Sequence, residues 1–267
     1  MALLLVKLLL TPAIVVATAV TGRRFGPAVS GWLIALPLIS GPITCFFAYE
    51  HGRAFAARAS VGSLSGTLGE TAFCLGWAVA AGRHSWPICL GSASAGFVAV
   101  GLLVEALPLD QNLPVPLLPL AAAGVGSLLL GLRFWPASAP AASDPVPMPR
   151  WDLPLRAIVA TAVLLLLTGL AEALGARLSG LVAVYPMYSA ILASFGHHHE
   201  GPDTALRVLR GLLLGLFAFV AFYLALAALL PRTGIPAAFG VATAVALAVQ
   251  SLALVSLHRD TPTPSSA

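Results

Sequence analysis

Long apolar runs recur from one end of this chain to the other. Nine of them approach the ~20 residues that an α-helix needs to cross the hydrocarbon core of a bilayer. They fall at 3–20, 28–49, 59–82, 86–107, 114–134, 154–172, 177–196, 205–230 and 234–257. Only 9% of the residues are charged, whereas a soluble globular chain carries roughly 25%. We therefore predict an all-α integral membrane protein with nine transmembrane helices.

The charges and cysteines narrow the functional class. The formal net charge of +4 is spread over many short loops, which argues against a nucleic-acid partner. Cys45, Cys74 and Cys89 lie in apolar stretches without the spacing of metal ligands, as is typical of inert buried thiols.

The apolar start lacks a basic region and a clear cleavage site, so we interpret it as a retained helix rather than a signal peptide. Because no P-loop, nucleophile elbow or cofactor fingerprint is present, we expect neither a cofactor nor an enzyme.

The two halves of the chain match when the sequence is shifted against itself by 149 residues, without a gap. Glycine, proline and arginine residues coincide at this offset, which shared apolar composition alone does not explain. We predict a first four-helix repeat over 3–107, a linking helix and Pro/Ala-rich linker over 108–153, a second repeat over 154–258 and a disordered tail over 259–267. The matched pairs include Gly26/Gly175, Ser30/Ser179, Gly31/Gly180, Pro37/Pro186, Ser40/Ser189, Phe46/Phe195, Gly52/Gly201, Arg58/Arg207, Gly62/Gly211, Gly66/Gly215, Arg83/Arg232 and Pro87/Pro236.

The predicted helix at 114–134 sets the relative orientation of the repeats. Because five helices precede the second repeat, that repeat enters the membrane from the opposite side. The repeats are then inverted copies related by a pseudo-two-fold axis in the membrane plane; without this helix they would be parallel. Nine Lys and Arg residues lie on one side of the membrane and five on the other, which favours an outside N-terminus and an inside C-terminus.

The second repeat carries a series of short motifs, namely Ser179–Gly180–Leu181, Pro186, Glu200–Gly201, Ala205–Leu206–Arg207 and Pro236–Ala237–Ala238–Phe239. With these motifs it resembles the GlpM family of small four-helix bacterial membrane proteins. The first repeat fits more loosely and departs from the pattern after Pro87, where Ile-Cys-Leu follows. The resemblance implies two four-helix units fused through one added helix, in the bacterial inner membrane.

A proline interrupts one apolar segment in each repeat, at Pro37 and at Pro186. Paired broken helices in the two halves of a membrane protein are the best sequence indication of a transport site. Ser40 and Ser189 follow three residues later, on the same helical face as the proline, and Tyr185 and Tyr188 flank Pro186. We predict that these side chains line a central cavity. The alternative is two ordinary kinked helices that pack tightly through Gly31 and Gly180.

Glu70 lies near the middle of an otherwise apolar predicted span. A charge at that depth costs a few kcal/mol (~3) on insertion scales, so we predict that this carboxylate binds and releases a proton or a cation. Its counterpart in the second repeat is Phe219, so the predicted site is asymmetric. The alternative is a protonated, hydrogen-bonded glutamate that fixes helix packing.

Each repeat also carries a Gly-x-x-x-Gly pattern, Gly62/Gly66 and Gly211/Gly215. Two glycines on one helix face allow close approach of a neighbouring backbone. We predict that these four residues pack helices across the boundary between the repeats.

The consecutive residues His197, His198, His199 and Glu200, with Asp203 nearby, form the main group of potential metal ligands. Adjacent residues on a helix point about 100° apart, so three consecutive histidines rarely converge on one metal. A solvated turn is therefore the favoured interpretation, and a zinc or nickel site or a pH sensor the alternative.

These observations favour a permease that moves a small solute by alternating access, with protons as a candidate second ligand and the lipid bilayer as its surroundings. We expect a monomer or a homodimer. The alternatives are a non-transporting membrane protein that supports envelope polysaccharide or lipid biosynthesis and, less consistent with the few acid–base residues, a membrane enzyme. A transporter predicts a water-accessible cavity at Pro37, Pro186 and Glu70, whereas a scaffold predicts a dry, closed bundle.

Overall fold

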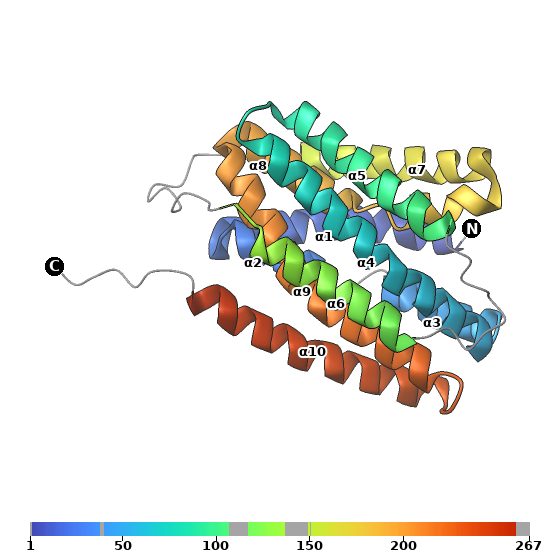
Figure 1. Cartoon of the computed structure of the whole chain (residues 1–267). Helices are drawn as coiled ribbons and strands as arrows, with labels where there is room; N and C mark the ends of the chain where they lie inside the picture. Colours follow the sequence, from blue (N-terminus) through green and yellow to red (C-terminus); the bar gives the residue numbers. More distant parts are fainter. Residues whose placement is uncertain (1, 38–39, 107–116, 137–148, 150, 260–267) are drawn as a thin grey trace.

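The computed structural model describes the backbone of residues 2–37, 40–106, 117–136, 149 and 151–259. Within these ranges it describes the side chains of all residues except 2–10, 105, 170–183 and 255–259. The described backbone forms helices and no strand, and the helices pack side by side (Figure 1). The ten helices in this part of the chain are α1 (Ala2–Phe25), α2 (Pro27–Ile34), α3 (Ser40–Glu50), α4 (Arg53–Ala81), α5 (Trp86–Ala106), α6 (Leu117–Arg133), α7 (Asp152–Ala183), α8 (Met187–Glu200), α9 (Pro202–Leu229) and α10 (Ile235–Arg259).

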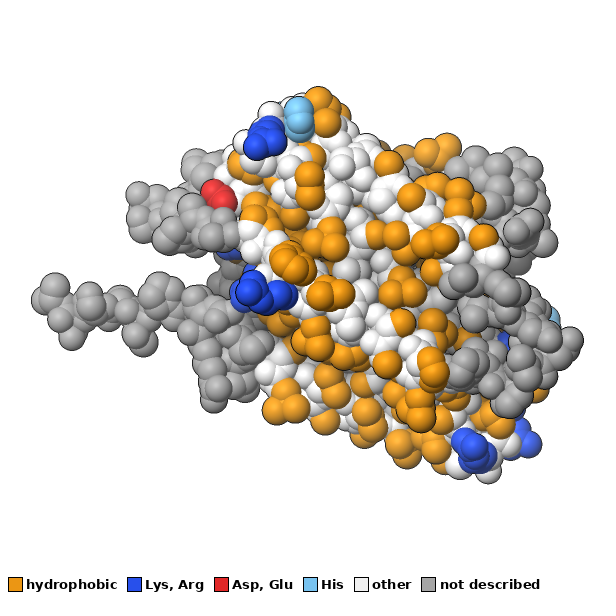
Figure 2. Space-filling model, viewed as in Figure 1, with side chains coloured by type: hydrophobic (Ala, Val, Ile, Leu, Met, Phe, Trp, Pro, Cys, Tyr) orange, Lys and Arg blue, Asp and Glu red, His pale blue; other side chains and the backbone are white. Residues whose placement is uncertain are grey.

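Four of these helices, α5, α7, α9 and α10, contain a stretch that is long and apolar enough to cross a membrane. Helices suit this environment because every backbone hydrogen bond is made within the segment. Figure 2 shows hydrophobic side chains spread over one face of the bundle, with Lys and Arg side chains toward its ends. Exposed Leu118, Leu166 and Leu252 belong to the apolar surface of the molecule. The described chain is therefore an all-helical membrane protein.

The helix breaks fall at the two predicted prolines, but the helix bounds differ from those predicted from the apolar runs. The single helix predicted over 28–49 is two helices, since α2 ends at Ile34 and α3 begins at Ser40, on either side of Pro37. The predicted boundary between 154–172 and 177–196 is wrong: α7 continues to Ala183, and the break falls at 184–186, beside Pro186. Proline removes a backbone donor and crowds the preceding turn, whereas the glycine at 175 only weakens a helix. The two prolines therefore set the breaks.

Equivalent helices of the two predicted repeats begin at positions 149 residues apart. α4 and α9 begin at Arg53 and Pro202, and α5 and α10 at Trp86 and Ile235. Gly52 and Gly201 precede α4 and α9 with φ angles of 85° and 93°, a left-handed conformation that glycine adopts without steric cost. In Figure 1 α4 runs from right to left and α9 from left to right, so the two equivalent helices are antiparallel.

Glycines bring α2 and α9 into backbone contact at the centre of the bundle. A Cβ atom added at Gly31 would lie 2.9 Å from the Leu212 nitrogen, and one added at Gly211 would lie 2.7 Å from the Ala28 carbonyl carbon. At Gly215 it would lie 2.6 Å from the Trp32 carbonyl oxygen. These distances leave no room for a side chain.

The other three glycines of the sequence prediction behave differently. Gly66 faces Val184, with 3.5 Å between an added Cβ atom and the valine Cβ, and an atom added at Gly62 would meet nothing within 4 Å. Gly180 lies outside the described side chains. The Gly-x-x-x-Gly pattern of the second repeat thus packs tightly on the first repeat, but its counterpart on α4 does not.

Candidate functional site

A cavity of about 200 Å³ lies where the two helix breaks meet, between α4 and α9. Six of the seven side chains predicted to line such a cavity line this one, and Pro37 does not. The predicted residues that line it are Ser40, Glu70, Tyr185, Pro186, Tyr188 and Ser189.

The breaks create this space because they end helices inside the bundle. The chain turns tightly at the second break, where the Met187 amide donates to the Tyr185 carbonyl oxygen at 2.8 Å, and at the first break the Gly41 amide donates to the Pro37 carbonyl oxygen at 2.9 Å. Within a membrane, irregular backbone is tolerated only where it is buried in protein or lines a cavity. Both conditions hold here.

The cavity is built from equivalent positions of the two predicted repeats. Five pairs of lining residues lie 149 positions apart, and one residue of each pair belongs to each repeat. The first repeat supplies Ser63 and Glu70 where the second supplies Leu212 and Phe219, so one wall is polar and the other is apolar. The pairs are Ala35/Val184, Leu36/Tyr185, Ser40/Ser189, Ser63/Leu212 and Glu70/Phe219.

Glu70 is the one charged side chain among the described residues that line the cavity. No hydrogen bond or ion pair from another described residue reaches its carboxyl group, so the alternative of a hydrogen-bonded structural glutamate has no partner there. An unpaired carboxylate in an apolar setting is costly unless it is protonated or neutralised by a cation. The cavity can therefore offer a site to a proton or to a positively charged group.

Two tyrosines present aromatic rings to the cavity and are held by hydrogen bonds from other helices. The Tyr188 hydroxyl lies 3.0 Å from the Thr11 Oγ1 atom of α1, and the Tyr185 hydroxyl lies 2.8 Å from the Ser94 Oγ atom of α5. The Tyr185 ring also packs edge-on against Phe97, with 5.5 Å between ring centroids. These contacts fix the second break relative to both flanking helices.

Sequence reasoning missed several of these residues. Ser63 lies seven residues before Glu70, which places both on one face of α4, and this spacing could have identified it. Thr11 and Ser94 carried no such signal, because their partners are 177 and 91 residues away.

Pro37 lines a different hollow, here called the first lateral groove, of about 580 Å³ between α3, α9 and α10. Its other walls include Gly41, Pro42, Cys45 and Phe46. A second lateral groove of about 350 Å³ lies between α5, α7 and α8. The prediction that both prolines line one central cavity is thus met by Pro186 alone.

The three consecutive histidines form the last turn of α8, where His198 is exposed and His197 and His199 are partly buried. The His198 and His199 rings pack against each other, with 4.8 Å between their centroids. His197 lies against Trp77, His198 against Trp86 and His199 against Trp151, with 5.9 to 6.4 Å between ring centroids. Within the described residues no three His, Cys, Asp or Glu side chains are grouped to hold a metal ion. Burial lowers the pKa of the His197 imidazole, which favours its neutral form.

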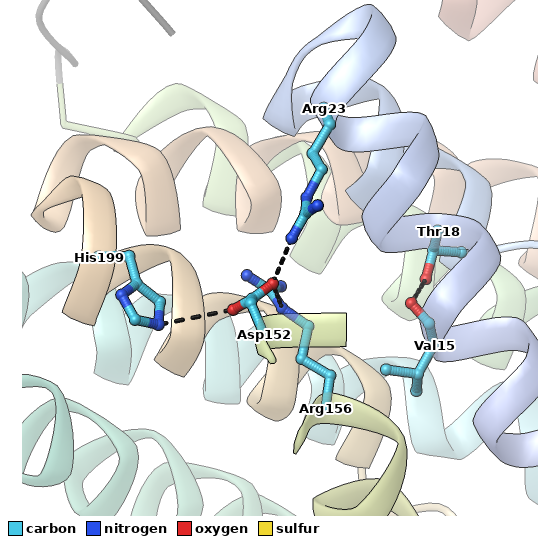
Figure 3. Close-up of polar contacts among 6 residues, drawn as sticks. All are labelled: Val15, Thr18, Arg23, Asp152, Arg156 and His199. Atoms are coloured by element: carbon cyan, nitrogen blue, oxygen red, sulfur yellow. Dashed lines mark hydrogen bonds and ion pairs between the residues drawn. The ribbon is translucent and has the colours of Figure 1, made fainter. Parts of the chain in front are cut away.

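His199 instead joins an ion cluster around the fully buried Asp152, shown in Figure 3. One Asp152 carboxylate oxygen accepts from Arg23 at 2.6 Å and from Arg156 at 2.9 Å, and the other lies 3.5 Å from the His199 Nε2 atom. The cluster links α1, α7 and α8 at one end of the bundle. No sequence signal pointed to it, because Arg23 and Asp152 are 129 residues apart.

No family model, curated protein or solved structure matches this chain.

Proposed function

We propose that the chain is a permease of the bacterial inner membrane that moves a small solute by alternating access. The observation that carries the proposal is the cavity at the two proline-associated breaks, with Glu70 unpaired within it. Transport sites in membrane proteins are typically built from interrupted helices near the middle of the bilayer. In this proposal, Glu70 binds a proton or a cationic group in the cavity, and the tyrosines and serines line the path of the solute.

The proposal includes two inverted repeats, nine membrane-crossing segments and an outside N-terminus. It is supported by helix starts that recur 149 residues apart, by the antiparallel directions of α4 and α9 and by the paired lining of the cavity. α2 and α3 together form one crossing in this scheme. Each half is then a unit similar to a GlpM-type protein, fused to its inverted copy through α6.

Contacts between the repeats at both ends of the bundle fit alternating access. At one end Arg23 of α1 pairs with Asp152 of α7 at 2.6 Å. At the other end Arg53 of α4 donates to the carbonyl oxygen of Thr233, after α9, at 2.8 Å. Each contact joins a helix of the first repeat to the second half of the chain, at the start of α7 or after α9, so opening of one while the other holds would expose the cavity to one side only.

Thiol labelling tests this proposal without knowledge of the solute. Ser40→Cys is introduced with Cys45 and Cys89 replaced by alanine, and a charged, membrane-impermeant methanethiosulfonate reagent is added to right-side-out and to inside-out vesicles. We expect labelling from both sides. The matched control keeps only the fully buried Cys74, which should react from neither side.

Protection of the thiol at position 40 from both sides would contradict the permease and favour the non-transporting membrane protein. Labelling from one side alone would contradict alternating access.

A further inference from the structure

Two residues connect the central cavity to the outer surface of the bundle. Leu36 lines both the cavity and the first lateral groove, and Tyr185 lines both the cavity and the second lateral groove. Leu36 and Tyr185 occupy equivalent positions, each directly before the proline of a break. In each half of the molecule one side chain therefore borders both the cavity and a groove.

The two lateral grooves are themselves equivalent. Six further pairs of lining residues lie 149 positions apart, and five of them come from the same segment of the repeat, so both halves build the same feature from it; the sixth pair is Leu90/Phe239. Both grooves open on apolar, exposed side chains such as Phe46, Leu155 and Leu247, which are suited to contact with lipid chains. The five pairs from that segment are Gly41/Ala190, Pro42/Ile191, Cys45/Ser194, Phe46/Phe195 and Tyr49/His198.

The sizes of the cavity and the grooves suit a ligand with two parts, a polar headgroup in the cavity and an apolar chain in a groove. At about 200 Å³ the cavity is smaller than the roughly 300–1,000 Å³ typical of sites for drug-sized ligands. The grooves, at about 580 and 350 Å³, provide apolar space next to it. A ligand with a small headgroup and an alkyl chain matches this arrangement.

The charge of the headgroup follows from the walls of the cavity. Among the described lining residues Glu70 is the one charged group, and no Lys, Arg or His side chain accompanies it. The rings of Tyr185, Tyr188 and Phe219 line the same space, and aromatic faces attract quaternary ammonium groups. An anionic headgroup would meet an unfavourable carboxylate.

We propose that the solute is an amphiphilic organic cation that reaches the cavity from the bilayer through a lateral groove. Its headgroup passes Leu36 or Tyr185 to Glu70, and its chain remains in the groove. This inference rests on the proposed permease function and adds the substrate class and the route of entry.

Binding of decyltrimethylammonium tests the substrate class. Equilibrium dialysis compares lipid nanodiscs that contain the full chain with empty nanodiscs, which corrects for partition into lipid. We expect saturable binding that Glu70→Gln weakens by at least about tenfold, because a buried opposite charge is lost. Glu50→Gln, at an exposed carboxylate outside the cavity, is the matched control and should leave binding unchanged.

Equal binding by the Glu70→Gln and unaltered proteins would overturn the proposal, as would equal affinity for decyl sulfate. Failure of this test is distinguishable from failure of the permease, since the thiol labelling uses no decyl ligand. A permease for another solute would keep two-sided labelling and lack this binding.

Blocking the grooves tests the route. Cys45→Trp fills the first groove and Val163→Trp the second, and both positions are only partly buried. The double variant should slow association of decyltrimethylammonium by about tenfold or more, since conformational obstacles act on association rates, while equilibrium binding of tetramethylammonium stays unchanged. An unchanged association rate in a variant with an unaltered melting temperature would show entry from water and overturn the lateral route.

Discussion

The close approach of α2 and α9 gives a prediction with a matched control in the same chain. Gly211 and Gly62 occupy equivalent positions in the two repeats, on α9 and α4. An added Cβ atom at Gly211 would lie 2.7 Å from the Ala28 carbonyl carbon, whereas one at Gly62 would meet nothing within 4 Å. Alanine should therefore have opposite effects at the two positions.

The magnitudes follow from the two environments. At Gly211 the obstacle is helix backbone, which cannot rotate away, and the Ala28 carbonyl oxygen lies even closer to the added atom than the carbonyl carbon does. α2 and α9 must therefore separate by more than about 1 Å to restore ordinary contact distances, and overpacking of this kind costs roughly 1–3 kcal/mol or more. At Gly62 the exchange removes a flexible glycine from a helix interior and stabilises by about 0.5–1 kcal/mol.

Thermal unfolding of the detergent-solubilised protein measures the difference. For a chain of this size 1 kcal/mol corresponds to roughly 2–4 °C in Tm. We expect Gly211→Ala to lower Tm by about 4–10 °C and Gly62→Ala to leave it unchanged or raise it by about 1–3 °C. Equal shifts for the two variants would refute the inferred α2–α9 contact.

Three further predictions concern the charged groups. Glu70→Gln should keep the Tm, because no described partner is lost, and abolish pH-dependent transport in proteoliposomes; retained pH dependence would remove Glu70 from the mechanism. Asp152→Asn removes the buried carboxylate that Arg23 and Arg156 share and should lower the free energy of unfolding by about 3–5 kcal/mol. The exposed control Glu50→Gln should leave it unchanged. Burial lowers the pKa of His197 in the folded protein, so as the pH falls this imidazole takes up a proton more readily in the unfolded chain. The free energy of unfolding should therefore be highest above the ordinary imidazole pKa of about 6.5 and should decrease as the pH is lowered below it. His197→Gln should flatten this pH profile of Tm, and exposed His198→Gln should not.

The internal repeat explains how much of the site could be predicted. Matched prolines located both breaks, and a matched serine followed each proline, so the positions of Ser40 and Ser189 at the cavity were predictable from the amino-acid sequence. Glu70 was identifiable because a carboxylate is costly in an apolar span. These signals depend on local chemistry and on one fixed offset.

Contacts between segments far apart in the chain could not be predicted from the amino-acid sequence. The offset equates Pro37 with Pro186, yet they face different spaces, because the walls around equivalent segments differ. Hydropathy likewise could not distinguish α2 and α3 from a single helix, since both are apolar. The Asp152 cluster was invisible because its members come from three separate helices.

Alternating access is the central claim, and distances between spin labels at the two ends of the bundle test it most directly. Pulsed electron paramagnetic resonance would measure the distance within two pairs of spin labels at exposed positions. One pair, His51→Cys with Arg232→Cys, lies at the Arg53–Thr233 end. The other, Arg24→Cys with His198→Cys, lies at the Asp152 end. Alternating access predicts two populated distances for each pair of labels. Conditions that favour the longer distance at one end of the bundle should favour the shorter distance at the other end. A single distance at both ends, unchanged by pH or by decyltrimethylammonium, would contradict it.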